Sequence, residues 1–230
     1  MARRAGRVGA LGAAGALVLA LGTGTVTPAS AATCTVTGIT PASVTVGLSP
    51  VTRTWGVRTG GCTVEHWYVL IDRAYVIADS AAPTWAIDPA YLVNGDAGTS
   101  YADVTVLSDD GEDTEATAPF TLKRRATWGS TLNAGPEPVK KGKKITVLGT
   151  LGRADWTRNA YVGYSGQRVR VQFRAAKTTT WTTVKTVITG TSGKVSTTIT
   201  ASRDGAWRLY YGGNSVTAAA TSKADYVDVR

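Results

Sequence analysis

The chain has 230 residues, enough for one large domain or for two β-sandwiches of ordinary size. Its formal net charge is +9, and 43% of its residues are hydrophobic against 18% charged, which is typical of a folded chain rather than a disordered one. One histidine and two cysteines leave few ligands for a zinc site and a single candidate for a histidine-based catalytic triad.

Residues 1–31 have the three parts of a secretory signal peptide. Basic residues come first, an apolar run follows over 8–22, and Ala29-Ser30-Ala31 supplies the small-residue cleavage pattern. The run is shorter than the roughly 20 residues that cross a bilayer, so we expect cleavage rather than a retained anchor. The mature chain would then have no transmembrane segment and be secreted, either extracellular or associated with the cell wall.

The two cysteines, Cys34 and Cys62, are expected to form a disulfide, as an exported chain allows. The alternative is a lipid anchor on Cys34. Lipoprotein signals place the cysteine directly after the apolar run, whereas here Thr33 precedes it and the run ends near Gly22. A disulfide that closes this loop would stabilise the fold by roughly 3 kcal/mol.

Beyond residue 31 the chain holds 33 Thr and 22 Val against 9 Leu, a balance that favours β-strands. No amphipathic helix is evident after the signal peptide. Apolar and polar residues alternate over 102–106, 168–174 and 195–200, and neither face of 64–71 is purely polar, as expected of a central strand. Turn signals lie at 94–95, 110–111, 192–193, 204–205 and 212–214.

These short strands predict an all-β protein of two antiparallel β-sandwiches in tandem. The basic run Lys123-Arg124-Arg125 and the break Gly135-Pro136-Glu137-Pro138 place the boundary between them. We therefore expect an acidic sandwich over 32–122, a linker and first strand over 123–142, and a basic sandwich over 143–230.

Three segments of the C-terminal half resemble strands of bacterial immunoglobulin-like domains from secreted and surface proteins. They are KGKKITVLGTL at 141–151, GQRVRVQF at 166–173 continued by WTTV at 181–184, and GAWRLYYGG at 205–213. The resemblance covers about residues 126–230 and extends to small exported proteins of high-GC Gram-positive bacteria. It implies that the C-terminal sandwich is immunoglobulin-like. The N-terminal half resembles such domains only loosely, and we expect the same fold there from its size.

Charge is divided between the two halves. Residues 32–122 hold three basic and eleven acidic side chains, net −8, whereas 123–230 hold nineteen and five, net +14. Such asymmetry suggests an anionic partner for the basic half, or contact between the halves or between molecules. Without a recognition helix or RNA-binding motif we expect no nucleic acid, and favour cell-wall anionic polymer or phospholipid head groups. The alternative is that these charges only keep the protein soluble.

The segment 152–166 is rich in side chains that suit sugars or anions, and we expect a long loop there. Its alternative role is an aromatic plug over the open end of the sandwich. Together with basic residues of the next strand, it gives the candidate ligand-binding set Arg153, Trp156, Arg158, Tyr161, Tyr164, Arg168, Arg170 and Arg174.

Catalysis and metal binding have weaker signals. His66 is the only imidazole, its neighbour Glu65 points to the opposite face of a strand, and no Gly-x-Ser-x-Gly elbow is present. Five carboxylates crowd into 109–115, but their spacing differs from a calcium loop, and a solvated turn explains them equally well. We expect no cofactor, no metal site and no catalytic residue.

The sequence therefore predicts a non-enzymatic binding or assembly module that engages an anionic cell-wall polymer or glycan through its basic half. The alternative is an adaptor or structural subunit in an extracellular protein complex. An enzyme of unrecognised type is the third and weakest hypothesis.

Overall fold

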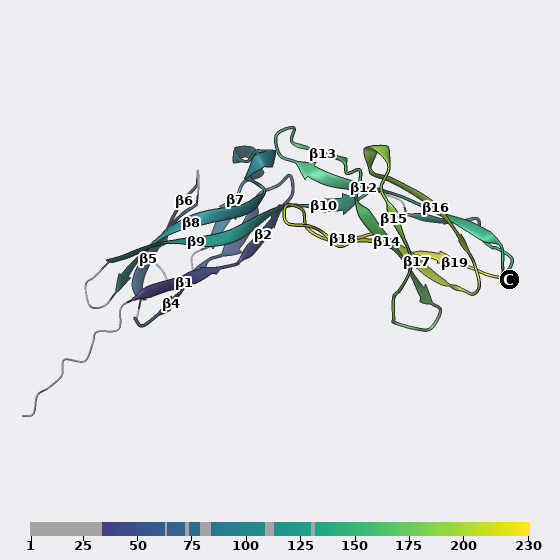
Figure 1. The fold of residues 1–230 in the computed structure, drawn as a ribbon, viewed down its shortest axis with the longest axis horizontal. Helices are drawn as coiled ribbons and strands as arrows, with labels where there is room; N and C mark the ends of the chain where they lie inside the picture. The colour runs from purple at the N-terminus through teal and green to yellow at the C-terminus, as the bar shows by residue number, and fades with distance from the viewer. Residues whose placement is uncertain (1–33, 63, 72–73, 79–83, 109–112, 130–131) are drawn as a thin grey trace, which may run out of the picture. The chain divides into compact units, whose positions relative to one another are not determined.

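The computed structural model describes residues 34–230 except 63, 72–73, 79–83, 109–112 and 130–131 (Figure 1). The predicted signal peptide lies outside the described residues and stays a prediction. Within them the regular structure is β-strand with three short 3₁₀ turns, and no described helix is long and apolar enough to cross a membrane. The predicted all-β fold of tandem sandwiches is confirmed.

The N-terminal half forms one five-stranded sheet and two small ones. The sheet order is β2-β9-β8-β5-β6, and the pairs β1-β4 and β3-β7 complete this half. All pairs are antiparallel except β2-β9, which is parallel. The strands are β1 (Thr35–Thr40), β2 (Ser43–Val46), β3 (Val51–Thr54), β4 (Gly56–Gly60), β5 (Val64–Ile71), β6 (Ala74–Ala78), β7 (Thr84–Ile87), β8 (Gly98–Ser108) and β9 (Asp113–Arg124), with η1 (Pro89–Tyr91) and η2 (Asn94–Asp96).

Alternation along β8 and β9 builds the N-terminal core. Val104 and Val106 of β8 are buried, as is Phe120 of β9, while the residues between them face outward. Trp55 packs edge-to-face on Phe120, with ring centroids 5.7 Å apart. Each buried aromatic side chain removes on the order of 200 Å² of surface from water, so this pair contributes strongly to the stability of the N-terminal half.

The C-terminal half forms two five-stranded sheets. In one, β12 pairs with β10, β11, β13 and β16; in the other, the order is β15-β14-β17-β18, with β19 also on β17. The strands are β10 (Ala126–Trp128), β11 (Asn133–Gly135), β12 (Lys144–Asp155), β13 (Ala160–Gly163), β14 (Arg168–Ala175), β15 (Thr182–Ile188), β16 (Lys194–Thr200), β17 (Gly205–Tyr211), β18 (Ala220–Thr221) and β19 (Asp225–Val227), with η3 (Thr191–Gly193).

Strand β12 contributes to the hydrophobic clusters of both halves. Leu151 belongs to the C-terminal cluster, whereas Ala154 near the end of β12 and Trp156 directly after it belong to the N-terminal one. The segment 123–142, expected as a linker and first strand, contains the end of β9 and the whole of β10 and β11. The domain boundaries themselves stay a prediction.

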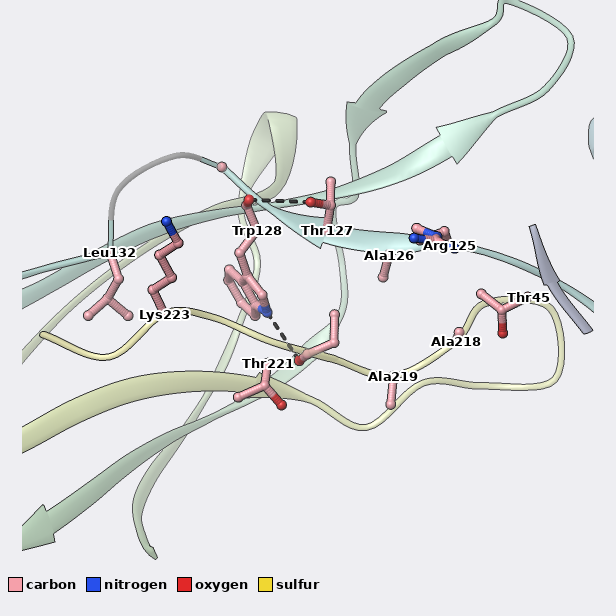
Figure 2. Close-up of a pocket in the computed structure, with 12 residues that line it drawn as sticks. Thr45, Arg125, Ala126, Thr127, Trp128, Leu132, Ala218, Ala219, Thr221 and Lys223 are labelled. Carbon is pink, nitrogen blue, oxygen red and sulfur yellow. Dashed lines mark hydrogen bonds between the residues drawn. The ribbon is translucent and has the colours of Figure 1, made fainter. Parts of the chain in front are cut away.

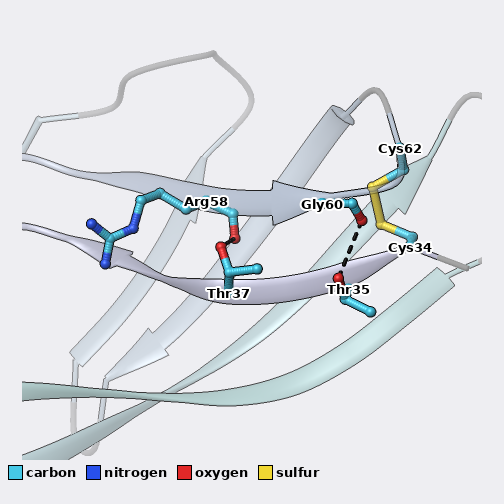
Figure 3. Close-up of a disulfide and its surroundings, with 6 residues drawn as sticks. All are labelled: Cys34, Thr35, Thr37, Arg58, Gly60 and Cys62. Carbon is cyan, nitrogen blue, oxygen red and sulfur yellow. Dashed lines mark hydrogen bonds between the residues drawn. A yellow bond between two sulfur atoms is a disulfide. The ribbon is translucent and has the colours of Figure 1, made fainter.

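The predicted disulfide is confirmed: Cys34 and Cys62 are bonded, with Cα atoms 5.0 Å apart (Figure 3). It ties together the ends of the antiparallel pair β1-β4, where Thr35 Oγ1 donates to the Gly60 carbonyl at 3.2 Å. Since exported proteins keep disulfides that the cytosol would reduce, this bond fits an extracellular protein.

Candidate anion-binding face

The segment 152–166, expected as a long loop, is mostly a β-hairpin. Strands β12 and β13 pair from Gly152 opposite Gly163 to Asp155 opposite Ala160, and a tight turn closes the end. Asn159 takes a positive φ of 49° in this turn, a conformation that asparagine tolerates better than most residues. Strand pairing therefore positions Arg153 and Tyr161, while Trp156 and Arg158 lie in the turn and Tyr164 directly follows β13.

Trp156 is buried, with 4% of its surface exposed. Its Nε1 donates to the carbonyl of Gly47 at 3.0 Å, and its ring packs in the N-terminal hydrophobic cluster. A sugar stacks on an exposed aromatic face, which this ring does not offer. The position of Trp156 supports a packing role.

Asp155 organises the hairpin turn beside Trp156. Its carboxylate accepts hydrogen bonds from Asn94 Nδ2 at 2.8 Å, from the backbone N–H of Arg158 at 3.0 Å and from the guanidinium of Arg158 at 3.2 Å. The hydrogen bond from Asn94 is the main cause of the lowered pKa of Asp155; burial opposes it, and the contacts with Arg158 lower the pKa further. The Arg158 side chain is thus committed to an ion pair, although it stays exposed.

Arg153 and Tyr164 stack on each other near the base of the hairpin. The guanidinium carbon of Arg153 lies 4.0 Å from the Tyr164 ring centroid, within cation–π range. The Tyr164 hydroxyl accepts from Asn214 Nδ2 at 2.9 Å. Burial raises the pKa of Tyr164, but hydrogen bonds from its neighbours and the charge of Arg153 bring the net shift below the usual value. Tyr161, by contrast, is 44% exposed.

The other candidates, Arg168, Arg170 and Arg174, lie on one face of β14. Val169 and Val171 between them are fully buried, so alternation turns the arginines outward. A fourth arginine, Arg208, joins them from the neighbouring strand β17, where the β14-β17 register places it opposite Gln172. We call Arg168, Arg170, Arg174 and Arg208 the arginine face.

Aromatic rings and an amide hold three of these guanidinium groups, those of Arg170, Arg174 and Arg208, in place. Trp181, just before β15, lies between two of them: its ring centroid is 4.1 Å from the guanidinium carbon of Arg208 and 4.9 Å from that of Arg174. Arg208 Nε also donates to Gln172 Oε1 at 2.8 Å, and Arg170 lies 5.7 Å from the ring of Tyr210. The face is therefore partly ordered before any ligand arrives.

Positive charge on this face has no acidic partner among the described residues. The ion pairs among the described residues join Arg158 to Asp155 and Arg230 to Asp228. Neither pair involves the arginine face. Burial first, and then the nearby charge of Arg174, lower the pKa of Arg208. A bound anion would relieve this repulsion and accept the remaining guanidinium hydrogen bonds.

The structure thus divides the candidate set in two. Arg168, Arg170 and Arg174 come together on one sheet face, while the hairpin residues of 152–166 lie on the β12 sheet. Sequence reasoning missed Arg208 and Trp181. Arg208 could have been found, since it alternates with buried Trp207 and Leu209 in a predicted strand, but Trp181 gives no such signal.

Metal and catalytic predictions are not decided by the structure. In the described part of the chain, no group of three or more His, Cys, Asp and Glu side chains could hold a metal ion. Residues 109–112 of the possible calcium turn lie outside it, and His66 is placed only as a residue of β5 opposite Leu107. That residues 109–115 bind no metal and that His66 is not catalytic therefore stay predictions from the sequence.

No protein-family model matches the chain, and no curated protein is significantly similar to it in sequence. Several solved structures are similar in fold. Fibronectin(III)-like modules of Clostridium thermocellum CbhA share 13% identity, over 86% of this chain and 93% of theirs, with a TM-score of 0.41. The three N-terminal domains of the bacteriophage RB49 outer capsid protein Hoc share 14%, over 86% and 70%, with a TM-score of 0.37.

A third similar structure is the Bacteroides ovatus protein SGBP-B, solved in complex with a mixed-linkage heptasaccharide. It shares 10% identity over 82% of this chain and 65% of that one, with a TM-score of 0.23. These likenesses extend to β-sandwich architecture and no further, so the function has to be argued from the residues of this chain.

Proposed function

We propose that this protein is a secreted, non-enzymatic binding module that holds an anionic polymer of the cell wall or an anionic glycan on its arginine face. The observation that carries the proposal is the set of four guanidinium groups on one side of two paired strands, without a carboxylate partner among the described residues. Guanidinium groups form paired hydrogen bonds with phosphate and carboxylate, which suits a chain of repeating anions.

Spacing on the sheet supports a polymer rather than a single ion. Alternate residues of a strand are about 7 Å apart, so the three arginines of β14 span on the order of 20 Å from Arg168 to Arg174. Arg208 widens this line by one strand, about 5 Å. Such an array presents several contacts to successive anionic groups of one polymer chain, and each adds to the affinity.

The experiment measures binding to poly(glycerol phosphate), with neutral dextran as the uncharged control polymer. The variant carries Arg168→Gln, Arg170→Gln, Arg174→Gln and Arg208→Gln together. If each exposed charge contributes about 0.5 kcal/mol, the variant should bind about 30-fold more weakly. Binding by the wild type should also weaken as salt rises, because exposed charges are screened.

A matched control variant distinguishes the contribution of the arginine face to the affinity from that of the overall net charge. Four exposed lysines lie before and at the start of β12, which belongs to a different sheet from β14 and β17, at positions 140, 141, 143 and 144. Replacing all four by Gln removes the same charge and should leave most of the affinity. Equal losses in the two variants would show that only overall charge matters, and no binding by the wild type would refute the proposal.

A second candidate function, an adaptor in an extracellular protein complex, is favoured by the N-terminal half. Asp103 of β8 and Asp113 and Glu115 of β9 are exposed on one outer sheet face. Such a face fits a basic protein partner. Affinity capture from culture supernatant should then recover one protein in fixed stoichiometry, and lose it when these three residues are changed to Asn and Gln.

A further inference from the structure

A pocket opens between β10 and β18, at the edge of the C-terminal sandwich (Figure 2). Its volume is about 630 Å³, within the roughly 300–1,000 Å³ usual for small-molecule sites. Arg125, Thr127 and Trp128 line it from one side, and Thr221 and Lys223 from the other.

Trp128 is the one aromatic side chain among the described lining residues, and it is held in place. Its Nε1 donates to the carbonyl of Ala220 at 3.1 Å, across the pocket. The six-membered ring of Trp128 also lies beside Gly149 of β12, where a built Cβ would be 3.7 Å from it, an ordinary contact distance. A fixed indole at a pocket wall is a suitable surface for the C–H face of a sugar ring, because an aromatic body supplies apolar contact at low entropic cost.

The charge of the pocket has one sign. Its twelve lining residues include two cations, Arg125 and Lys223, and no carboxylate. Figure 2 shows these cations toward opposite ends, with the Trp128 ring between them. The hydroxyls of Thr127 and Thr221 add neutral hydrogen-bonding groups. An anionic ligand rich in hydroxyl groups matches this combination of charge, hydroxyls and aromatic surface.

The pocket borders the sheet that carries the arginine face. In the sheet register Arg170 is opposite Tyr210, and Tyr210 is opposite Thr221, which lines the pocket. Two strand spacings separate the first and last of these residues, about 10 Å. A polymer that crosses the arginine face along this row would therefore reach the pocket within one or two sugar units.

We propose that this pocket binds one negatively charged sugar residue, a uronic acid or a sugar phosphate, with the ring against Trp128 and the anion at Lys223 or Arg125. The inference rests on the proposed function, because it makes the polymer on the arginine face an anionic glycan and assigns one of its units a dedicated site.

The experiment titrates ¹⁵N-labelled protein with glucuronic acid, glucose 1-phosphate and neutral glucose, and follows the indole N–H signal of Trp128. Trp128→Phe identifies that signal. We expect the anionic sugars to shift it and glucose to shift it only at much higher concentration. The two anionic probes distinguish a carboxylate from a phosphate as the preferred group.

Lys223→Gln or Arg125→Gln, whichever removes the cation that holds the anion, should weaken the response to the anionic sugars by about tenfold, since one charge-assisted contact is lost; no effect of either would contradict the assignment. Lys194→Gln, an exposed lysine of β16, is the matched control and should change nothing. Equal affinity for glucose and glucuronic acid, or no shift with any probe at tens of millimolar, would overturn the pocket assignment.

Polymer binding by the wild type separates the two proposals. Suppose that the wild type binds poly(glycerol phosphate) and the arginine-face variant does not. The absence of a Trp128 shift with the sugars then refutes only the sugar site in the pocket. If the polymer does not bind either, the proposed function fails as well.

Discussion

Replacing Trp156 distinguishes a packing role from a ligand-binding one. Its ring lies in the N-terminal hydrophobic cluster, although the residue follows β12 of the C-terminal half. We expect Trp156→Ala to destabilise the protein strongly and to leave its affinity for anionic polymer unchanged. The reason is that the side chain contacts the protein over nearly its whole surface.

The magnitude follows from burial and from one hydrogen bond. A buried tryptophan removes about 200 Å² from water, worth about 5 kcal/mol at 25 cal/mol/Å². Compact unfolded chains lower such values, and measured losses for Trp→Ala are roughly 3–5 kcal/mol. Trp156→Phe keeps most of the ring but leaves the buried carbonyl of Gly47 without its indole donor, which costs about 1–3 kcal/mol.

The assay is urea unfolding followed by far-ultraviolet circular dichroism, which does not depend on tryptophan emission. Trp156→Phe serves where Trp156→Ala folds too poorly to measure. Tyr161→Ala is the control on the same hairpin, because its side chain is 44% exposed and its loss should change stability by less than about 1 kcal/mol.

A Trp156→Ala protein with an unchanged urea midpoint and a lost affinity for polymer would refute this reasoning. It would mean that the indole contacts ligand rather than the N-terminal cluster. Equal destabilisation by Tyr161→Ala would also contradict it, since the two side chains differ mainly in burial.

Three further predictions concern the disulfide, one carboxylate and two glycines. Cys34→Ser combined with Cys62→Ser should lower the free energy of unfolding by about 3 kcal/mol, measured by urea unfolding of both proteins without reductant. The pKa of Asp155 is lowered in the folded state, so its contribution to stability is present above the ordinary value near 4 and is lost as pH falls through the folded value. Asp155→Asn should therefore be less stable at neutral pH and should lack that part of the acid dependence between pH 2 and 6; identical pH profiles would contradict the hydrogen-bonded arrangement. Gly193 (φ +75°) and Gly142 (φ +84°) both occupy the left-handed region, but a Cβ on Gly193 would overlap the Leu151 carbonyl whereas Gly142 faces open space. Gly142→Ala should cost about 1–2 kcal/mol and Gly193→Ala a further 1–3 kcal/mol, compared by thermal unfolding.

Strand composition and the cysteine count were sufficient to predict the fold class and the disulfide. Both depend on local properties: β-branched residues favour strands, and an exported chain with two cysteines has one possible internal bond. The hairpin over 152–166 was missed because its residues do not alternate between apolar and polar. Its pairing is set by β12, and its Trp156 is buried by contacts with residues about a hundred positions away, such as Gly47.

Part of the arginine face was also predictable. Alternation in 168–174 places its three arginines on one side of a strand without knowledge of the rest of the fold. That Arg208 joins them depends on the register between β14 and β17, whose paired residues are some 30 to 40 positions apart in sequence. Trp181 lies in the connection before β15, outside any strand with alternating apolar and polar residues. Only the three-dimensional structure therefore places it between two guanidinium groups.

The position of Trp181 has an optical consequence. Indole emission responds to the charge around the ring, and this ring lies within 5 Å of two guanidinium carbons. An anion that neutralises or moves either group changes the electric field on the indole, so occupancy of the face should alter the emission of the unlabelled protein. The difference between wild type and Trp181→Phe isolates this signal from the other six tryptophans. The protein thus carries its own spectroscopic reporter at the surface where its partner is expected.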